Sequence, residues 1–193
     1  MIDKDVIGKI KKEQGCDIFF ETGFYKGQSV QAALELGFEK VYSIELLKEF
    51  YDAGCQKFKS EISEGRVNLI ADDSANLHRY LGDIVNRKVM FWFDAHHDNG
   101  GTPVTDMKSS CPLLDEISAL SLFDIKPVIL VDDIRVIRGD STQMWGPQAW
   151  GEKSVNVQAI IEKIKRLPFD YSMYYVDGSH PTIPMPEDIL VAV

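Results

Sequence analysis

Residues 18–29 read Ile-Phe-Phe-Glu-Thr-Gly-Phe-Tyr-Lys-Gly-Gln-Ser, an apolar run that breaks into a glycine turn and reopens as a helix. The apolar residues 18–20 predict a short buried strand. Gly23 permits a tight turn, and Gly27 permits a ligand to come close to the start of the next helix. Free N–H groups at that helix start favour an anionic or strongly polar ligand group. The stretch therefore predicts a cofactor pocket of the nucleotide-binding type.

The spacing of the acidic residue and the glycines distinguishes between two classes of cofactor. A dinucleotide fingerprint has the form Gly-x-Gly-x-x-Gly, whereas this chain has Glu21-x-Gly23-x-x-x-Gly27. A negative charge at Glu21 suits a cationic group better than a pyrophosphate. A glycine turn that serves packing alone remains the alternative interpretation.

This pattern resembles motif I of the class I S-adenosylmethionine-dependent methyltransferases. In that family the acidic residue helps to hold the methionine end of the cofactor. The resemblance implies that Glu21 has this role here, and that Gly23, Gly27 and Ser29 belong to the same binding site.

Apolar runs and helix-like segments alternate along the rest of the chain, which predicts an α/β sheet. Further strands are expected at residues 41–44, 67–71, 89–93, 128–131, 171–176 and 189–193, and helices at 27–36, 47–62, 113–122 and 155–167. A final hairpin after five strands resembles the methyltransferase sheet. The resemblance implies a Rossmann-like, mostly parallel seven-stranded sheet with an antiparallel last strand.

Polar residues follow the second and third strands, at the edge where open α/β sheets bind ligands. Glu45 ends the second strand, where a carboxylate can accept both ribose hydroxyls, although a charge at the start of the next helix is the alternative. Asp72-Asp73-Ser74 follows the third strand. In the family a residue here meets the adenine amino group, and the choice between Asp72 and Asp73 stays open. For Ser74, capping of the next segment is favoured over cofactor contact.

The fourth and fifth strands each end in aspartate. Asp94 follows the fourth strand, and the pair Asp132 and Asp133 follows the fifth. Carboxylates from neighbouring strand ends can converge on a hard divalent cation such as Mg²⁺. The arrangement resembles the metal site of the catechol and macrocin types of O-methyltransferase, which implies that these three aspartates hold a metal that acidifies the substrate hydroxyl. Capping of the following segments is the alternative.

The pair His96-His97 comes two residues after Asp94. A neutral imidazole is suited to proton removal near neutral pH, so His96 is the candidate general base, with metal ligation as the alternative. The family resemblance also makes Asp94 both a cofactor-binding and a catalytic residue.

A wider likeness extends over nearly the whole chain. Residues 91–96 (Phe-Trp-Phe-Asp-Ala-His), 100–102, 111–116, 129–135 and 187–193 resemble a bacterial group of FkbM-like methyltransferases. Such proteins are often associated with sugar and polysaccharide modification, so the resemblance implies a glycan or other small-molecule acceptor with a free hydroxyl. The irregular segment 97–110 is a candidate for a mobile substrate lid. Segment 138–153 contains Met144, Trp145 and Trp150, and the aromatic faces there are candidates to stack on the acceptor, with ordinary packing against the domain as the alternative.

Composition excludes several other classes. The 193 residues fit a single domain over 1–193, and the formal net charge of −9 argues against a nucleic-acid partner. The basic clusters at 9–12 and 163–166 are expected to be solvated helix faces. No run has the length of a membrane span, and residues 1–5 lack the order of a signal peptide, so a cytoplasmic location is expected. The oligomeric state is left open.

The sequence therefore predicts an S-adenosylmethionine-dependent O-methyltransferase that is assisted by Mg²⁺ and acts on a sugar hydroxyl. Two alternatives remain. A nicotinamide-dependent oxidoreductase would share the alternating architecture and Glu45, but the third fingerprint glycine is missing. A non-catalytic cofactor-binding module is also possible, because a fold alone does not establish activity.

Overall fold

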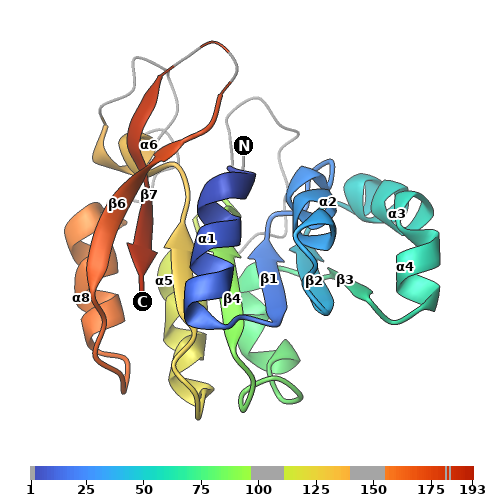
Figure 1. The fold of residues 1–193 in the computed structure, drawn as a ribbon, viewed down its shortest axis with the longest axis horizontal. Coiled ribbons are helices and arrows are strands. Elements are labelled where there is room, and N and C mark those ends of the chain that lie inside the picture. Colours follow the sequence, from blue (N-terminus) through green and yellow to red (C-terminus); the bar gives the residue numbers. More distant parts are fainter. Residues whose placement is uncertain (1–2, 97–110, 140–154, 181, 183) are drawn as a thin grey trace.

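The computed structural model describes residues 3–96, 111–139, 155–180, 182 and 184–193. One sheet of seven strands runs through these residues in the order β3-β2-β1-β4-β5-β7-β6 (Figure 1). Strands β1 to β5 pair in parallel, and β7 is antiparallel to both β5 and β6. This confirms the predicted Rossmann-like sheet with an antiparallel last strand. The strands are β1 Ile18–Thr22, β2 Lys40–Glu45, β3 Val67–Ala71, β4 Val89–Phe93, β5 Val128–Val131, β6 Met173–Gly178 and β7 Met185–Ala192.

Helices cover both faces of the sheet (Figure 1). One face packs against α1 (Lys4–Gln14), α2 (Gln28–Glu35) and the α3 (Lys48–Lys57) and α4 (Lys59–Ser63) pair. The other face packs against the 3₁₀ helix η1 (Ser74–Tyr80), α5 (Leu113–Ala119) with its 3₁₀ extension η2 (Leu120–Leu122), α6 (Ile134–Arg138) and α8 (Val157–Lys165). The central strands are therefore buried on both sides, which is why they read as continuous apolar runs in the sequence.

The direction of the crossovers reverses between β1 and β4. Chain segments from β1 lead through α2 to β2 on one side, whereas β4 leads through α5 to β5 on the other. In open α/β sheets the carboxyl ends of the strands at such a reversal form a crevice that binds ligands. The fold therefore locates the candidate site at the ends of β1 and β4.

Several predicted boundaries differ from the observed ones. The helix expected over 47–62 breaks at Phe58, a buried residue with φ −106° and ψ 26° that separates α3 from α4. The helix expected over 113–122 ends as the 3₁₀ turn η2. The last strand begins at Met185 rather than 189, so the hairpin with β6 is longer than expected. The short elements η1 and α6 were not predicted as elements.

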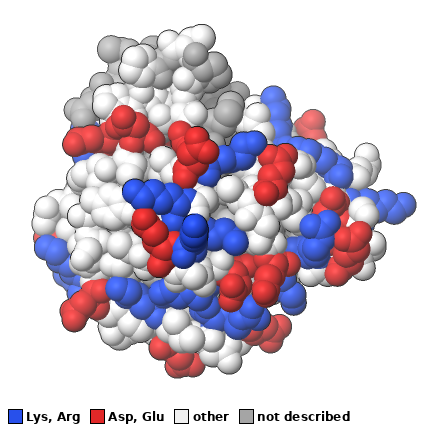
Figure 2. Space-filling model, in the orientation of Figure 1, with Lys and Arg blue, Asp and Glu red and all other residues white. Residues whose placement is uncertain are grey.

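Acidic and basic side chains are interspersed over the visible face of the molecule (Figure 2). Among the described residues, no helix has the length and apolar character needed to cross a bilayer. The single domain over 1–193 stays a prediction.

Candidate functional site

Backbone hydrogen bonds bring the strand ends together. The Gly23 N–H donates to the Ile44 carbonyl at 3.0 Å, and the Asp94 N–H donates to the Thr22 carbonyl at 3.2 Å. The Asp132 N–H donates to the Phe93 carbonyl at 3.1 Å. The turn after β1 and the residues that follow β4 and β5 therefore lie at one edge of the sheet, as the sequence predicted.

Gly23 lies where no larger residue fits. Its φ is +87°, and a Cβ atom here would lie 2.7 Å from the Asp94 carbonyl oxygen. The glycine thus permits the close approach of the β1 turn to the end of β4. A bulky replacement would displace the Asp94 backbone as well as any ligand, so it could not separate cofactor binding from folding.

Gly27 closes the turn as the N-cap of α2, with φ +65° and no side-chain cap. A Cβ atom at Gly27 or at Gly54 of α3 would lie within 2.6 Å of the Phe24 ring, so the two glycines form a slot that holds this ring. The first turn of α2, which includes Ser29, is thereby fixed with its N–H groups at the edge of the site. Such a helix start is suited to bind a carboxylate.

Glu21 is fully buried beneath this turn. Its Oε1 accepts a hydrogen bond from the Ser43 hydroxyl at 2.7 Å, and its Oε2 has no hydrogen-bond partner in the described part of the chain. Burial raises the pKa of Glu21 to about 8, against the opposing effect of the Ser29 and Ser43 hydroxyls. A buried carboxyl with an unpaired oxygen is costly unless a ligand or water completes it.

Glu45 ends β2 and reaches back to the glycine turn. Its two carboxylate oxygens accept hydrogen bonds from the N–H groups of Tyr25 at 2.8 Å and Leu47 at 2.7 Å. Burial raises its pKa, and these backbone bonds oppose that effect. Glu45 thus fixes Tyr25, which has the unusual φ of +49°. Each oxygen keeps a second lone pair, so the carboxylate can still accept a ribose hydroxyl.

The side chains that follow β3 form hydrogen bonds within their own segment. Asp72 accepts hydrogen bonds from the Asp73 N–H, the Asn76 amide and the Tyr80 hydroxyl. Asp73, not Ser74, is the N-cap of η1, because its side chain accepts from the Ala75 N–H. The prediction that Ser74 caps this segment was therefore wrong. Ser74 is instead buried in the first turn of η1.

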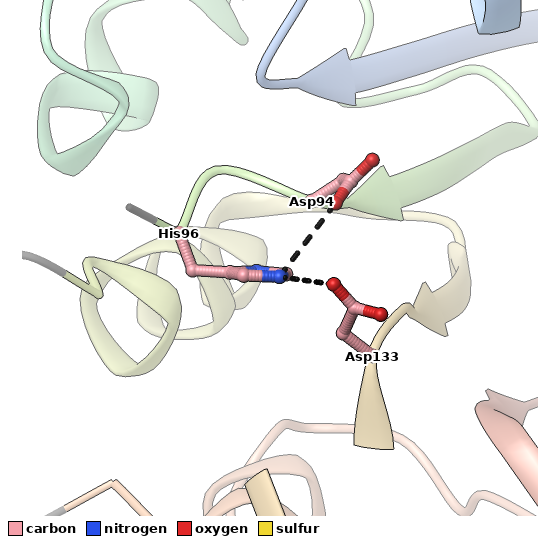
Figure 3. Close-up of side chains that lie close together, drawn as sticks. All are labelled: Asp94, His96 and Asp133. Atoms are coloured by element: carbon pink, nitrogen blue, oxygen red, sulfur yellow. Dashed lines mark hydrogen bonds and ion pairs between the residues drawn. The ribbon is translucent and has the colours of Figure 1, made fainter. Parts of the chain in front are cut away.

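Asp94, His96 and Asp133 lie close together at this edge (Figure 3). The His96 Nε2 atom lies 2.8 Å from Asp133 Oδ2 and 3.8 Å from Asp94 Oδ1. Asp133 adopts a left-handed conformation with φ 54°, which directs its side chain from the end of β5 toward the residues after β4. The structure thus brings together three of the residues that the sequence singled out.

The charges in this cluster shift one another's proton affinities. Burial opposes protonation of His96, but the hydrogen bond and charge of Asp133 outweigh it and raise its pKa to about 9. Burial would raise the pKa of Asp133, but the charges of His96 and Arg135 lower it to about 2. Burial raises the pKa of Asp94 to about 7, and the charge of Glu21 adds to that effect. Burial beside Asp94 and Asp133 also raises the pKa of Asp132.

The cluster has the composition of a divalent-cation site. One ligand atom from each of Asp94, His96 and Asp133 lies within 4.8 Å of the others, and so does one from each of Asp132, Asp133 and Asp188. Two carboxylates and an imidazole are ligands that suit a divalent metal. The three predicted ligands Asp94, Asp132 and Asp133 do not form one group, because Asp94 lies in the first and Asp132 in the second. Because His96 carries a proton at its pKa of about 9, a base role at neutral pH requires that its pairing with Asp133 first be weakened.

Sequence reasoning missed three site residues. Arg135 donates to Asp133 Oδ1 at 2.8 Å and also pairs with Asp188 on β7. Glu116 of α5 is buried, and burial raises its pKa to about 7. Both acidic residues could have been noticed in the sequence, because Glu116 interrupts the apolar face of a helix and Asp188 precedes the apolar run of a buried strand.

Some predicted site residues lie outside the described residues. These are segment 97–110, which includes His97, and residues 140–154, which include Met144, Trp145 and Trp150.

Comparisons with known proteins bear on the fold. No family model and no curated protein sequence matches the chain. Among solved structures, an O-methyltransferase from Bacillus cereus in complex with S-adenosylhomocysteine (SAH) is similar, with a TM-score of 0.66 at 16% identity, over 98% of this chain and 79% of that one. An O-methyltransferase of tomaymycin synthesis from Streptomyces achromogenes, in complex with S-adenosylmethionine, has a TM-score of 0.61 at 12% identity, covering 100% and 81%.

An rRNA methylase from Streptococcus thermophilus is also similar, with a TM-score of 0.55 at 16% identity, over 100% of this chain and 97% of that one. At such identities the likeness establishes the fold alone. The chain has the Rossmann-like class I methyltransferase fold, with the strand order β3-β2-β1-β4-β5-β7-β6 and β7 antiparallel to its two neighbours.

Proposed function

We propose that the protein is an S-adenosylmethionine-dependent O-methyltransferase that is assisted by Mg²⁺ and acts on a hydroxyl of a sugar or glycan. The observation that carries the proposal is that two groups of acidic residues lie at the same edge of the sheet. Glu21 and Glu45 flank the glycine turn, and the Asp94, His96 and Asp133 cluster lies at the neighbouring strand ends. The charge of Glu21 contributes to the raised pKa of Asp94, so the two groups share one electrostatic environment.

The cofactor would lie across the turn after β1. Glu21 and the start of α2, with Gly23, Gly27 and Ser29, would hold the methionine end, and Glu45 would accept the ribose hydroxyls. Asp72, Asp73 or Ser74 would face the adenine. Glu21 is buried at substantial cost in the free protein, and an ammonium or sulfonium group nearby would favour its charged form.

In the proposed reaction the acceptor oxygen attacks the methyl carbon, an O–C bond forms, the C–S bond breaks and SAH leaves. The hydroxyl proton goes to His96, which must first lose the proton that Asp133 holds in place. Asp94, Asp132 and Asp133 would hold Mg²⁺, which when bound lowers the pKa of a hydroxyl on it. The remaining contribution to catalysis is to position the acceptor oxygen in line with the methyl group.

The nature of the acceptor is inferred from charge. The net charge of −9 and the acidic site disfavour nucleic acid, although two structural neighbours are described as a putative rRNA methylase and an rRNA methylase. A neutral hydroxylated molecule meets no such repulsion. We propose a cytoplasmic location.

A transfer assay tests this function. The protein is incubated with methyl-deuterated S-adenosylmethionine and a panel of sugars, nucleotide sugars, phenols and RNA, with Mg²⁺ or with excess chelator. We expect a labelled methyl group on a hydroxylated small molecule, and a loss of about a hundredfold or more in rate on chelation. Label on RNA would contradict the acceptor class, and an unchanged rate in chelator would contradict the metal but not the methyl transfer.

A further inference from the structure

Arg135 places a fixed positive charge against one face of the acidic cluster. Its Nη1 donates to Asp133 Oδ1 at 2.8 Å, while Asp133 Oδ2 lies 2.8 Å from His96 Nε2. Both oxygens of Asp133 are thereby assigned, one to the guanidinium and one to the space shared with His96 and Asp94. The positive charge of Arg135 would therefore offset part of the negative charge that Asp133 offers to a metal in that space.

Asp188 holds Arg135 in this position. Its Oδ1 accepts from the Arg135 backbone N–H at 3.2 Å, and its Oδ2 accepts from the same guanidinium nitrogen that reaches Asp133. Asp188 is 1% exposed. A buried carboxylate with one cationic partner constrains that partner strongly, because separation would leave the charge uncompensated.

The antiparallel hairpin is shaped to admit Asp188. The pairing of β6 with β7 is irregular between Val176 and Gly178, and Glu187 has a positive φ of 50°. A Cβ atom at Gly178 would lie 2.7 Å from Asp188 Oδ2, so only glycine leaves room for this carboxylate. Such irregularities commonly redirect a side chain beside a site.

We propose that Arg135, anchored by Asp188, sets how tightly the strand-end carboxylates around Asp133 bind a divalent cation. The inference rests on the metal part of the proposed function. Arg135 lowers the affinity by repulsion, and its hydrogen bond to Asp133 Oδ1 disfavours a bidentate contact of Asp133 with the ion. Asp188 is a positioning residue that acts through Arg135, because the guanidinium pairs with Asp188 as well as with Asp133.

The test is a titration with Mn²⁺ alone, followed by electron paramagnetic resonance, on the full chain. Arg135→Met should tighten Mn²⁺ binding by about tenfold or more, because a unit charge beside a ligand oxygen acts on a divalent ion through a partly buried medium. Arg135→Lys keeps the charge and should stay within about threefold of the wild type. Asp188→Asn should weaken binding, because the guanidinium then has Asp133 as its remaining carboxylate partner.

The double variant Arg135→Met/Asp188→Asn decides how Asp188 acts. It removes both charges of the pair, so it leaves no uncompensated buried ion and is the variant expected to fold best. If Asp188 acts through Arg135, the double variant binds Mn²⁺ more tightly than the wild type. Weak binding like that of Asp188→Asn alone would overturn the proposal, as would Mn²⁺ affinity that is unchanged in Arg135→Met or absent in every variant.

Glu187→Gln is the matched control, since it removes an exposed carboxylate from the neighbouring position of β7 and should leave Mn²⁺ affinity unchanged. SAH binding, measured in parallel, distinguishes a failure of the proposed methyltransferase function from a failure of the inference about Arg135. A wild type that does not bind SAH contradicts the methyltransferase proposal whatever Mn²⁺ does. A wild type that binds SAH, with Mn²⁺ affinity indifferent to Arg135, contradicts this inference alone.

Discussion

Asp133→Asn should lower kcat for methyl transfer by about a thousandfold and leave the Kd for SAH unchanged. Asp133 has φ 54°, a conformation that asparagine tolerates better than alanine, so the substitution keeps the backbone at the end of β5. It removes the charge that orients His96 and pairs with Arg135. In the proposed mechanism this charge acts on the reacting hydroxyl and not on the cofactor, which is why kcat should fall while the Kd for SAH stays unchanged.

The measurement combines initial rates with calorimetric titration of SAH. Asp124→Asn makes the same chemical change at an exposed position after η2 and should alter neither constant. A kcat that falls no further than in this control would remove Asp133 from the mechanism. An equal loss in SAH affinity would show that the cluster holds the cofactor instead.

Glu21→Gln should stabilise the free protein at alkaline pH and weaken cofactor binding. Burial raises the pKa of Glu21 to about 8 from an ordinary 4.5, so the folded chain keeps a proton that the unfolded chain releases. The stability that this proton contributes is complete below pH 4.5 and is lost as the pH rises through about 8. Glutamine does not ionise, so the variant avoids the loss. Its melting temperature at pH 8.5 should exceed that of the wild type by about 5 °C or more.

The same substitution should raise the Kd for SAH by about tenfold or more, because the carboxylate can no longer pair with the ammonium group. Melting curves without ligand at pH 5 and pH 8.5, together with SAH titrations, test both effects. Glu49→Gln, at an exposed position of α3, is the control. Weaker SAH binding with no gain in alkaline stability would contradict the buried, proton-bearing state of Glu21, whereas unchanged SAH binding would remove it from the cofactor site.

The central strands could be predicted because they are buried on both faces, and the edge strand β3 because its residues are mostly apolar. Residues 41–44, 67–71, 89–93 and 128–131 appear as apolar runs, and the observed strands match them within one residue. The turn after β1 could be predicted because Glu21 and the glycines are close in sequence, and left-handed backbone is the usual reason for glycine at such positions. The elements that were missed, η1 and α6, are short helices of seven and five residues, too short to show a helical period in the sequence.

The charged contacts of the site were harder to predict. Arg135 and Asp188 are 53 residues apart, and their contact depends on the antiparallel placement of β7 beside β5. Sequence reasoning grouped Asp94 with Asp132 and Asp133, but it could not assign the oxygens of Asp133 to His96 and Arg135. The break at Phe58 likewise follows from burial of its ring beside Phe24, which helical periodicity does not reveal.

Calorimetric titration of the wild-type chain with SAH, and separately with NADH, tests the central claim most directly. The spacing of Glu21, Gly23, Gly27 and Glu45 at the ends of β1 and β2 predicts that one molecule of SAH binds per chain and raises the melting temperature by mass action, while NADH gives no heat. Binding of NADH without binding of SAH would contradict the account and favour the oxidoreductase alternative.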